Sequence, residues 1–108
     1  MEPAQHPETA FKILTEAQWV QFEAEGVFRG APVDVADGYI HLSTADQLQG
    51  ILNRHFAGQD GLVIAEVSLA SLNDLVKWEA SRGGAFFPHI YGDLPMSAVV
   101  GYLTQIKA

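Results

Sequence analysis

The sequence predicts an α+β fold with a curved, mostly antiparallel sheet and two main helices. Strand-like and helix-like segments are mixed along the chain, and their connections are too irregular for a repeating βαβ series. A length of 108 residues, 48% hydrophobic and 18% charged, is typical of one globular domain. We expect residues 1–9 to be a flexible N-terminal leader and residues 10–108 to be a single domain.

The first predicted helix has clear signals at both ends. After a short strand at residues 10–14, Thr15 and Gln18 have the spacing of a capping box, and Gly26 is placed to end the helix. Glycine and proline in residues 27–38 predict a loop or an irregular hairpin arm.

The rest of the chain continues this mixed pattern. Apolar and polar residues alternate over residues 39–43, which predicts a strand, and a second capping pattern at Thr44 and Gln47 opens a predicted helix that ends at Gly58. The remaining predicted elements are a central strand at 62–69, a helical turn at 72–75, a short strand at 76–80, a strand at 86–91, and a closing strand at 96–106 preceded by a helical turn. We expect the strand at 86–91 to be peripheral, because it contains Pro88.

Charge and composition disfavour several classes of partner. Asp and Glu number 13 against 6 Lys and Arg, so the net charge of -7 makes nucleic acid an unfavourable partner. The absence of cysteine suits a reducing compartment, and no apolar run approaches the roughly 18 residues that span a bilayer. We therefore expect a cytoplasmic protein with no membrane association, and the sequence identifies no protein partner.

The first candidate site lies on the strand at residues 39–43. Alternation places Tyr39, His41 and Ser43 on one face, just before the predicted helix start at Thr44. Free N–H groups at a helix start attract anions, so we interpret Tyr39, Ser43 and Thr44 as ligand-binding. We interpret His41 as catalytic, because an imidazole can exchange a proton near neutral pH. The alternative is that Ser43 or Thr44 only caps the helix while His41 bonds a neighbouring carbonyl.

The second candidate site is the sequence Trp78-Glu79-Ala80-Ser81-Arg82-Gly83-Gly84. Glu79 fits a general base or an acceptor for a ribose hydroxyl, and Arg82 fits a bidentate phosphate ligand beside the backbone of Gly83. The alternative is a surface ion pair between Glu79 and Arg82 over an ordinary turn.

The third candidate site is the sequence Phe86-Phe87-Pro88-His89-Ile90-Tyr91. Alternation places Phe87, His89 and Tyr91 on one face, and an aromatic face with an imidazole suits a flat heterocycle. We interpret His89 as catalytic and Phe87 and Tyr91 as ligand-binding; the alternative for Phe87 is a place in the core. No H-E-x-x-H, G-K-[ST], G-x-S-x-G or G-x-G-x-x-G motif occurs, and we predict no metal site.

Several of these segments together resemble a known family. DGYIHLSTADQ and RGGAFFPHIYG, with FKILTEAQW and HFAG, resemble the bacterial family called domain of unknown function 952 from about Phe11 to Leu103. The resemblance implies a fold related to the ADP-ribosyltransferases, whose split antiparallel sheets form a cleft for NAD. It implies that His41 contacts a ribose and that Tyr91 or Tyr39 packs against nicotinamide.

The resemblance is less complete for the acidic residue that orients a ribose hydroxyl. Glu79 is the available acid, but it precedes His89 and Tyr91, whereas the acidic residue of that superfamily usually comes last. Only Asp93 lies in the late position.

Three functions remain open from the sequence. The first is an ADP-ribosyltransferase-like domain that takes NAD, or another nucleotide-ribose or phosphate ligand, as substrate or ligand; if catalytic, it would be a glycosyl transferase or a related phosphotransferase. The second is a two-histidine phosphoesterase with His41 and His89 as acid and base. The third is a noncatalytic module for ligand binding or protein interaction.

Overall fold

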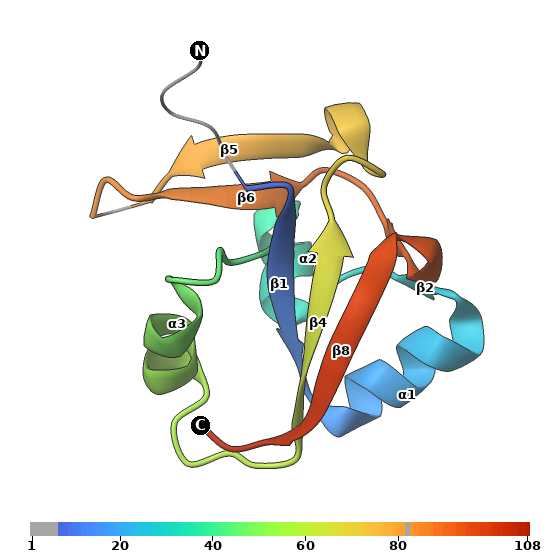
Figure 1. The fold of residues 1–108 in the computed structure, drawn as a ribbon, viewed down its shortest axis with the longest axis vertical. Coiled ribbons are helices and arrows are strands. Elements are labelled where there is room, and N and C mark those ends of the chain that lie inside the picture. Colours follow the sequence, from blue (N-terminus) through green and yellow to red (C-terminus); the bar gives the residue numbers. More distant parts are fainter. Residues whose placement is uncertain (1–6, 82) are drawn as a thin grey trace.

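The computed structural model describes residues 7–81 and 83–108, which form an α+β fold (Figure 1). All paired strands are antiparallel, so the predicted class is confirmed at this level. None of the helices in these ranges has the length and apolar run that a membrane crossing requires. The strands form two three-stranded sheets and a two-stranded sheet of β2 (Val27–Phe28) and β7 (Leu94–Pro95).

The first three-stranded sheet consists of β1 (Thr9–Leu14), β4 (Leu62–Ser68) and β8 (Val99–Ile106), in that order. Helix α1 (Glu16–Glu25) contributes Trp19 and Phe22 to the larger hydrophobic core. Helix α3 (Leu48–His55) contributes Leu52 to a second, smaller core cluster. The two helices flank this sheet (Figure 1), so each covers a different part of its apolar surface.

The second three-stranded sheet consists of β3 (Ile40–His41), β6 (Phe86–Ile90) and β5 (Val76–Ala80), in that order. Strands β5 and β6 lie across the ends of β1 and β4 (Figure 1). Ile40 lies opposite Ile90, and both side chains are buried in the larger core. Because side chains alternate along a strand, the neighbouring His41 and His89 belong to the other face of this sheet.

Several sequence predictions are confirmed. The Thr15 hydroxyl accepts the Gln18 N–H at 3.1 Å, and the Gln18 amide oxygen accepts the Thr15 N–H at 2.9 Å, which completes the capping box of α1. Gly26 ends that helix with a φ of 76°, a conformation that glycine adopts without strain. Strands β4 and β5 lie where they were predicted, and a 3₁₀ turn at Asn73–Leu75 matches the predicted helical turn. A 3₁₀ turn also precedes the closing strand, but it occupies Met96–Ala98, the first residues of the predicted strand, so β8 begins at Val99.

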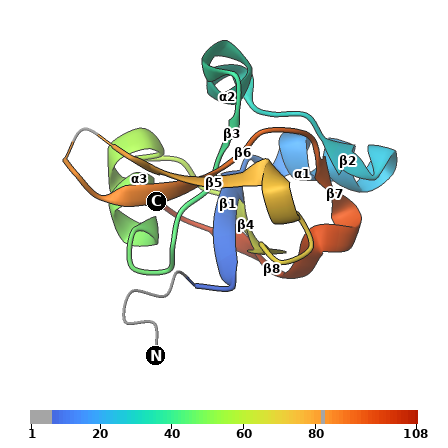
Figure 2. The ribbon, with the colours of Figure 1, turned by 90° about the horizontal axis from the view of Figure 1, so that it is seen from above.

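The prediction of a loop or hairpin arm over residues 27–38 was wrong. This segment contains β2 and a third helix, α2 (Pro32–Asp37), which lies beside β3 (Figure 2). Pro32 suits the first turn because a helix does not use the N–H groups there. The Asp34 carboxylate also accepts the Ala31 N–H at 2.7 Å. Six residues are too few to show a helical period in the sequence.

Two predicted boundaries also differ. Strand β3 covers only Ile40–His41, because the chain then turns to the first sheet, where Ser43 forms an isolated bridge with Phe11. Helix α3 begins at Leu48 and not at Thr44. The predicted contact between the Thr44 N–H and the Gln47 side chain exists, at 2.9 Å, but it closes a turn that precedes the helix.

Strand β6 is the central strand of its sheet, although Pro88 predicted a peripheral one. The Pro88 carbonyl accepts the Leu42 N–H at 3.1 Å, so the backbone of Pro88 faces the β3 side. In an antiparallel strand the nitrogen and carbonyl of a residue face the same neighbour. The missing N–H of Pro88 therefore falls just beyond the end of β3, and the ladder with β5 loses no donor.

Candidate functional site

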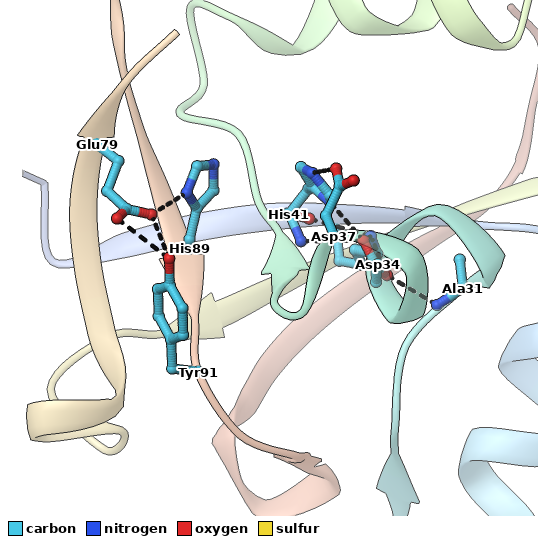
Figure 3. A network of polar contacts seen from close by, with 8 residues as sticks. Ala31, Asp34, Asp37, His41, Glu79, His89 and Tyr91 are labelled. Carbon is cyan, nitrogen blue, oxygen red and sulfur yellow. Dashed lines mark hydrogen bonds and ion pairs between the residues drawn. The ribbon is translucent and has the colours of Figure 1, made fainter.

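The outward face of the second sheet carries both predicted catalytic histidines. His41 on β3 and His89 on β6 lie directly opposite each other, with ring centroids 5.4 Å apart and ring planes at 71°. The two imidazoles lie side by side, and their carboxylate partners lie on opposite sides (Figure 3). The sequence left this pairing open because it depends on strand register. We call His41, His89, Glu79, Tyr39 and Tyr91 the histidine cluster.

Glu79 on β5 orients His89. The Glu79 Oε1 atom lies 2.6 Å from His89 Nδ1, and the Tyr91 hydroxyl donates to both carboxylate oxygens at 2.8 and 3.1 Å. The hydrogen bonds from His89 and then Tyr91 hold the pKa of Glu79 below its usual value. An ionised carboxylate only accepts hydrogen bonds, so Nδ1 of His89 carries the proton.

The second ring nitrogen of His89 is open. The residue is 8% exposed, and Nε2 has no hydrogen-bond partner among the described residues. Every buried side-chain nitrogen and oxygen in that part of the chain has a partner, so Nε2 must reach solvent. A buried imidazole with an oriented Nδ1–H and an accessible Nε2 has the arrangement of a general acid or base.

His41 contacts two carboxylates of helix α2. Its Nδ1 lies 2.6 Å from Asp34 Oδ1, and its Nε2 lies 3.0 Å from Asp37 Oδ2. Both contacts are hydrogen bonds at the same time only when His41 carries a proton on each nitrogen. The Asp34 carboxylate also accepts the backbone N–H of His41 at 3.1 Å. Helix α2 therefore fixes both the backbone and the ring of His41.

Asp34 is itself held by a buried lysine. Lys12 on β1 is 7% exposed and donates to Asp34 Oδ1 at 3.2 Å, to Oδ2 at 2.9 Å, and to the His41 carbonyl at 3.0 Å. Burial raises the pKa of Asp34, but Lys12 and the hydrogen bonds from His41 and Ala31 outweigh it, so the net pKa is lowered. Burial also lowers the pKa of Lys12, against the opposing effect of Asp34. This pair links the first sheet to the site.

Tyr39 is the central aromatic residue of the cluster. Its ring stacks on His89 with centroids 4.1 Å apart and planes at 25°. It also lies 4.8 Å from the His41 ring and 5.2 Å from the Tyr91 ring. Tyr39 therefore contacts both histidines, and Tyr91 lies next to Tyr39.

Of the other predicted ligand-binding residues, Phe87 shares the face of the histidine cluster, whereas Ser43 and Thr44 do not belong to it. Phe87 lies opposite Glu79, on the same face as His89. Ser43 and Thr44 are buried where the chain bridges to β1, and their hydrogen bonds are with Phe11, Gln47 and Asp46. Gly83 is exposed in the turn between β5 and β6, and Arg82 lies outside the described residues.

Two hollows in the described surface lie away from the histidine cluster. One, of about 320 Å³, is lined by Trp19 and Tyr102 between α1 and β8, and the other, of about 300 Å³, is lined by Phe22 and residues 27–32. Neither is lined by a residue of the histidine cluster. The cluster is presented on a sheet face.

Sequence reasoning missed Lys12, Asp34 and Asp37. A lysine within the apolar strand FKIL is one available signal, because a buried cation needs a partner. Pro32 two residues before Asp34 is another, because proline and an acidic residue are both common in a first helical turn. Among the residues that the structure covers, no three histidine, aspartate or glutamate side chains are arranged to hold a metal ion.

A crystal structure and a solution NMR structure of one protein are similar to this chain. The crystal structure of protein CC0527 from Caulobacter crescentus is 45% identical, with a TM-score of 0.86 over 89% of this chain and 84% of that chain. The solution NMR structure of CC0527 is 43% identical, with a TM-score of 0.82 over 94% of this chain and 89% of that chain.

A family model identifies the family of this chain. No protein with a curated description matches the chain. A family model described as "Protein of unknown function (DUF952)" matches residues 13–102, which include every residue of the histidine cluster. The chain therefore belongs to the DUF952 family.

Proposed function

We propose that the histidine cluster binds NAD or another ligand with a nucleotide-ribose group, and that the chain is an ADP-ribosyltransferase-like domain. The observation that carries the proposal is the environment of His89. Its Nδ1 is held by Glu79, its Nε2 reaches solvent, and His41 lies directly opposite. The arrangement of two antiparallel three-stranded sheets also agrees with the split sheet of that superfamily.

The chemistry of the cluster suits the parts of such a ligand. Tyr39 and Tyr91 offer aromatic surface for a flat heterocycle, with rings 5.2 Å apart. Nε2 of His89 can accept a proton from a ribose hydroxyl, because its Nδ1–H is directed to Glu79. His41, fixed by Asp34, supplies a second polar contact on the same face.

Glu79 supplies negative charge where a transferase needs it. A ribose becomes positively charged as nicotinamide leaves, so a nearby ionised carboxylate favours the transition state. The lowered pKa of Glu79 keeps it ionised at neutral pH. Because its oxygens already accept from His89 and Tyr91, we assign Glu79 primarily to orienting His89.

A backbone-amide NMR titration with NAD, ADP-ribose and nicotinamide tests the proposal. We expect shifts at residues 39–41, 77–79 and 87–91, and their loss in His41→Ala and His89→Ala. His55→Ala is the matched control, since His55 is exposed on α3. Failure of all three ligands to shift these amides at millimolar concentration would refute the proposal.

The distance between the histidines favours a second candidate, phosphoester hydrolysis. Ring centroids 5.4 Å apart allow one imidazole to act as base and the other as acid on a single phosphate ester. Cyclic and linear phosphate esters are the substrates to assay. Hydrolysis that persists in either His41→Ala or His89→Ala would exclude this mechanism.

A further inference from the structure

A third basic residue extends the row of histidines. Lys77 on β5 lies opposite His89 on β6, and His89 lies opposite His41 on β3. Directly opposite residues project from the same face of an antiparallel sheet, so all three side chains share the outward face. Neighbouring strands are about 4.8 Å apart, and the row therefore spans about 10 Å.

The charge of Lys77 is available to a ligand. Its side chain is exposed, and its ammonium forms no hydrogen bond or ion pair within the part of the chain that the structure describes. Its Nζ lies 6.0 Å from the centroid of the Tyr91 ring. Lys77 therefore lies beside the histidine cluster without a short ion pair, and its charge helps to lower the pKa of Glu79.

The nearby carboxylates are already occupied. Glu79 accepts hydrogen bonds from His89 and Tyr91. Asp34 is 1% exposed and paired with Lys12, and Asp37 contacts His41. An anion that binds on this face thus has the ammonium of Lys77 as a cation that is not committed to a short ion pair.

We infer that Lys77 binds a phosphate group of the ligand beside His89 and so selects phosphorylated ribosides over neutral ones. This inference rests on the proposed function, because it identifies the substrate class of the same site. A lysine ammonium only donates hydrogen bonds, whereas the Nε2 of an imidazole that already donates through Nδ1 is an acceptor. Lysine suits a phosphate as a point charge.

Two ligands that differ by one phosphate test the inference. We would measure the Kd of nicotinamide mononucleotide and of nicotinamide riboside for the native chain, Lys77→Gln and Lys77→Arg. Lys107→Gln is the matched control, because Lys107 is exposed near the far end of the first sheet. We expect the native chain to prefer the mononucleotide by about tenfold, as one charge-assisted contact implies.

The variants separate this inference from the proposed function. In Lys77→Gln the preference should fall to about twofold through weaker mononucleotide binding, while Lys77→Arg and Lys107→Gln keep it. If both ligands bind at the cluster but Lys77→Gln leaves their ratio unchanged, the role of Lys77 is wrong and the proposed function stands. If neither these ligands nor ADP-ribose bind, the proposed function itself fails.

Discussion

His41 and His89 lie directly opposite each other on β3 and β6, yet their surroundings differ. His41 is held at both ring nitrogens by Asp34 and Asp37, whereas His89 is held only at Nδ1, by Glu79. The rings are 5.4 Å apart. The pair thus combines one imidazole that is held at both ring nitrogens with one whose Nε2 is free of partners in the described ranges, and four predictions follow from these contacts.

Replacing Glu79 by alanine should change the tautomer of His89. The carboxylate fixes the proton on Nδ1, so its removal allows the proton to occupy Nε2. Ring ¹⁵N chemical shifts, measured in alkaline solution where the imidazole is neutral, should show a mixture of tautomers in Glu79→Ala. Glu23→Ala, an exposed change on α1, is the control and should keep the native spectrum. An unchanged His89 spectrum in Glu79→Ala would contradict the assigned role.

Asp34→Asn should destabilise the fold by about 3 kcal/mol, because it leaves the buried Lys12 ammonium without a counter-charge. Asp37→Asn should cost less than about 1 kcal/mol, since Asp37 is exposed. Urea unfolding measures both. The double change Lys12→Met and Asp34→Asn should cost less than the sum of the single changes, because the two groups form one pair. Strict additivity would show that the pair is not coupled.

The contribution of Asp34 should disappear in acid. Its pKa in the folded chain is lowered: burial raises it, but the charge of Lys12 and the hydrogen bonds from His41 and Ala31 outweigh burial. The folded state therefore holds fewer protons than the unfolded state, whose aspartates have a pKa of about 3.9. The stabilisation is complete above that value and is lost as pH falls through the folded pKa. The difference in unfolding free energy between the native chain and Asp34→Asn should shrink below about pH 4; a constant difference would refute this linkage.

Short sequence motifs were sufficient to predict elements that are stabilised by contacts between neighbouring residues. The capping box at Thr15 and the glycine at Gly26 bound α1 because both act through the nearest turn. By contrast, Pro88 predicted a peripheral strand, and only the short extent of β3 explains how proline fits in a central one. That fit depends on which neighbour faces the missing N–H, and the sequence of β6 alone carries no such information.

Some residues of the candidate site could likewise be predicted from local pattern, and others could not. Alternation placed His89 and Tyr91 on one face, and both contact Glu79. The partners of His41 could not be found in this way, because Asp34 belongs to a six-residue helix that was read as a loop. Lys12, which pairs with Asp34, comes from a strand and lies 22 positions before Asp34 in the chain. Contacts of this kind depend on tertiary packing and leave no short-range pattern.

Tyr91 should ionise at higher pH than an ordinary tyrosine. Its hydroxyl donates to Glu79, and this hydrogen bond, followed by burial and the charges of Glu79 and Tyr39, raises the pKa of Tyr91. Ultraviolet titration of the tyrosines should therefore contain a late component that is absent from Tyr91→Phe. In Glu79→Ala the same component should move to lower pH, because the phenol loses both its acceptor and the neighbouring negative charge. Tyr102→Phe, far from the cluster on β8, is the control and should leave the late component in place. A late component that survives in Tyr91→Phe would mean that another tyrosine has the raised pKa and that the Tyr91–Glu79 bond is not maintained in solution.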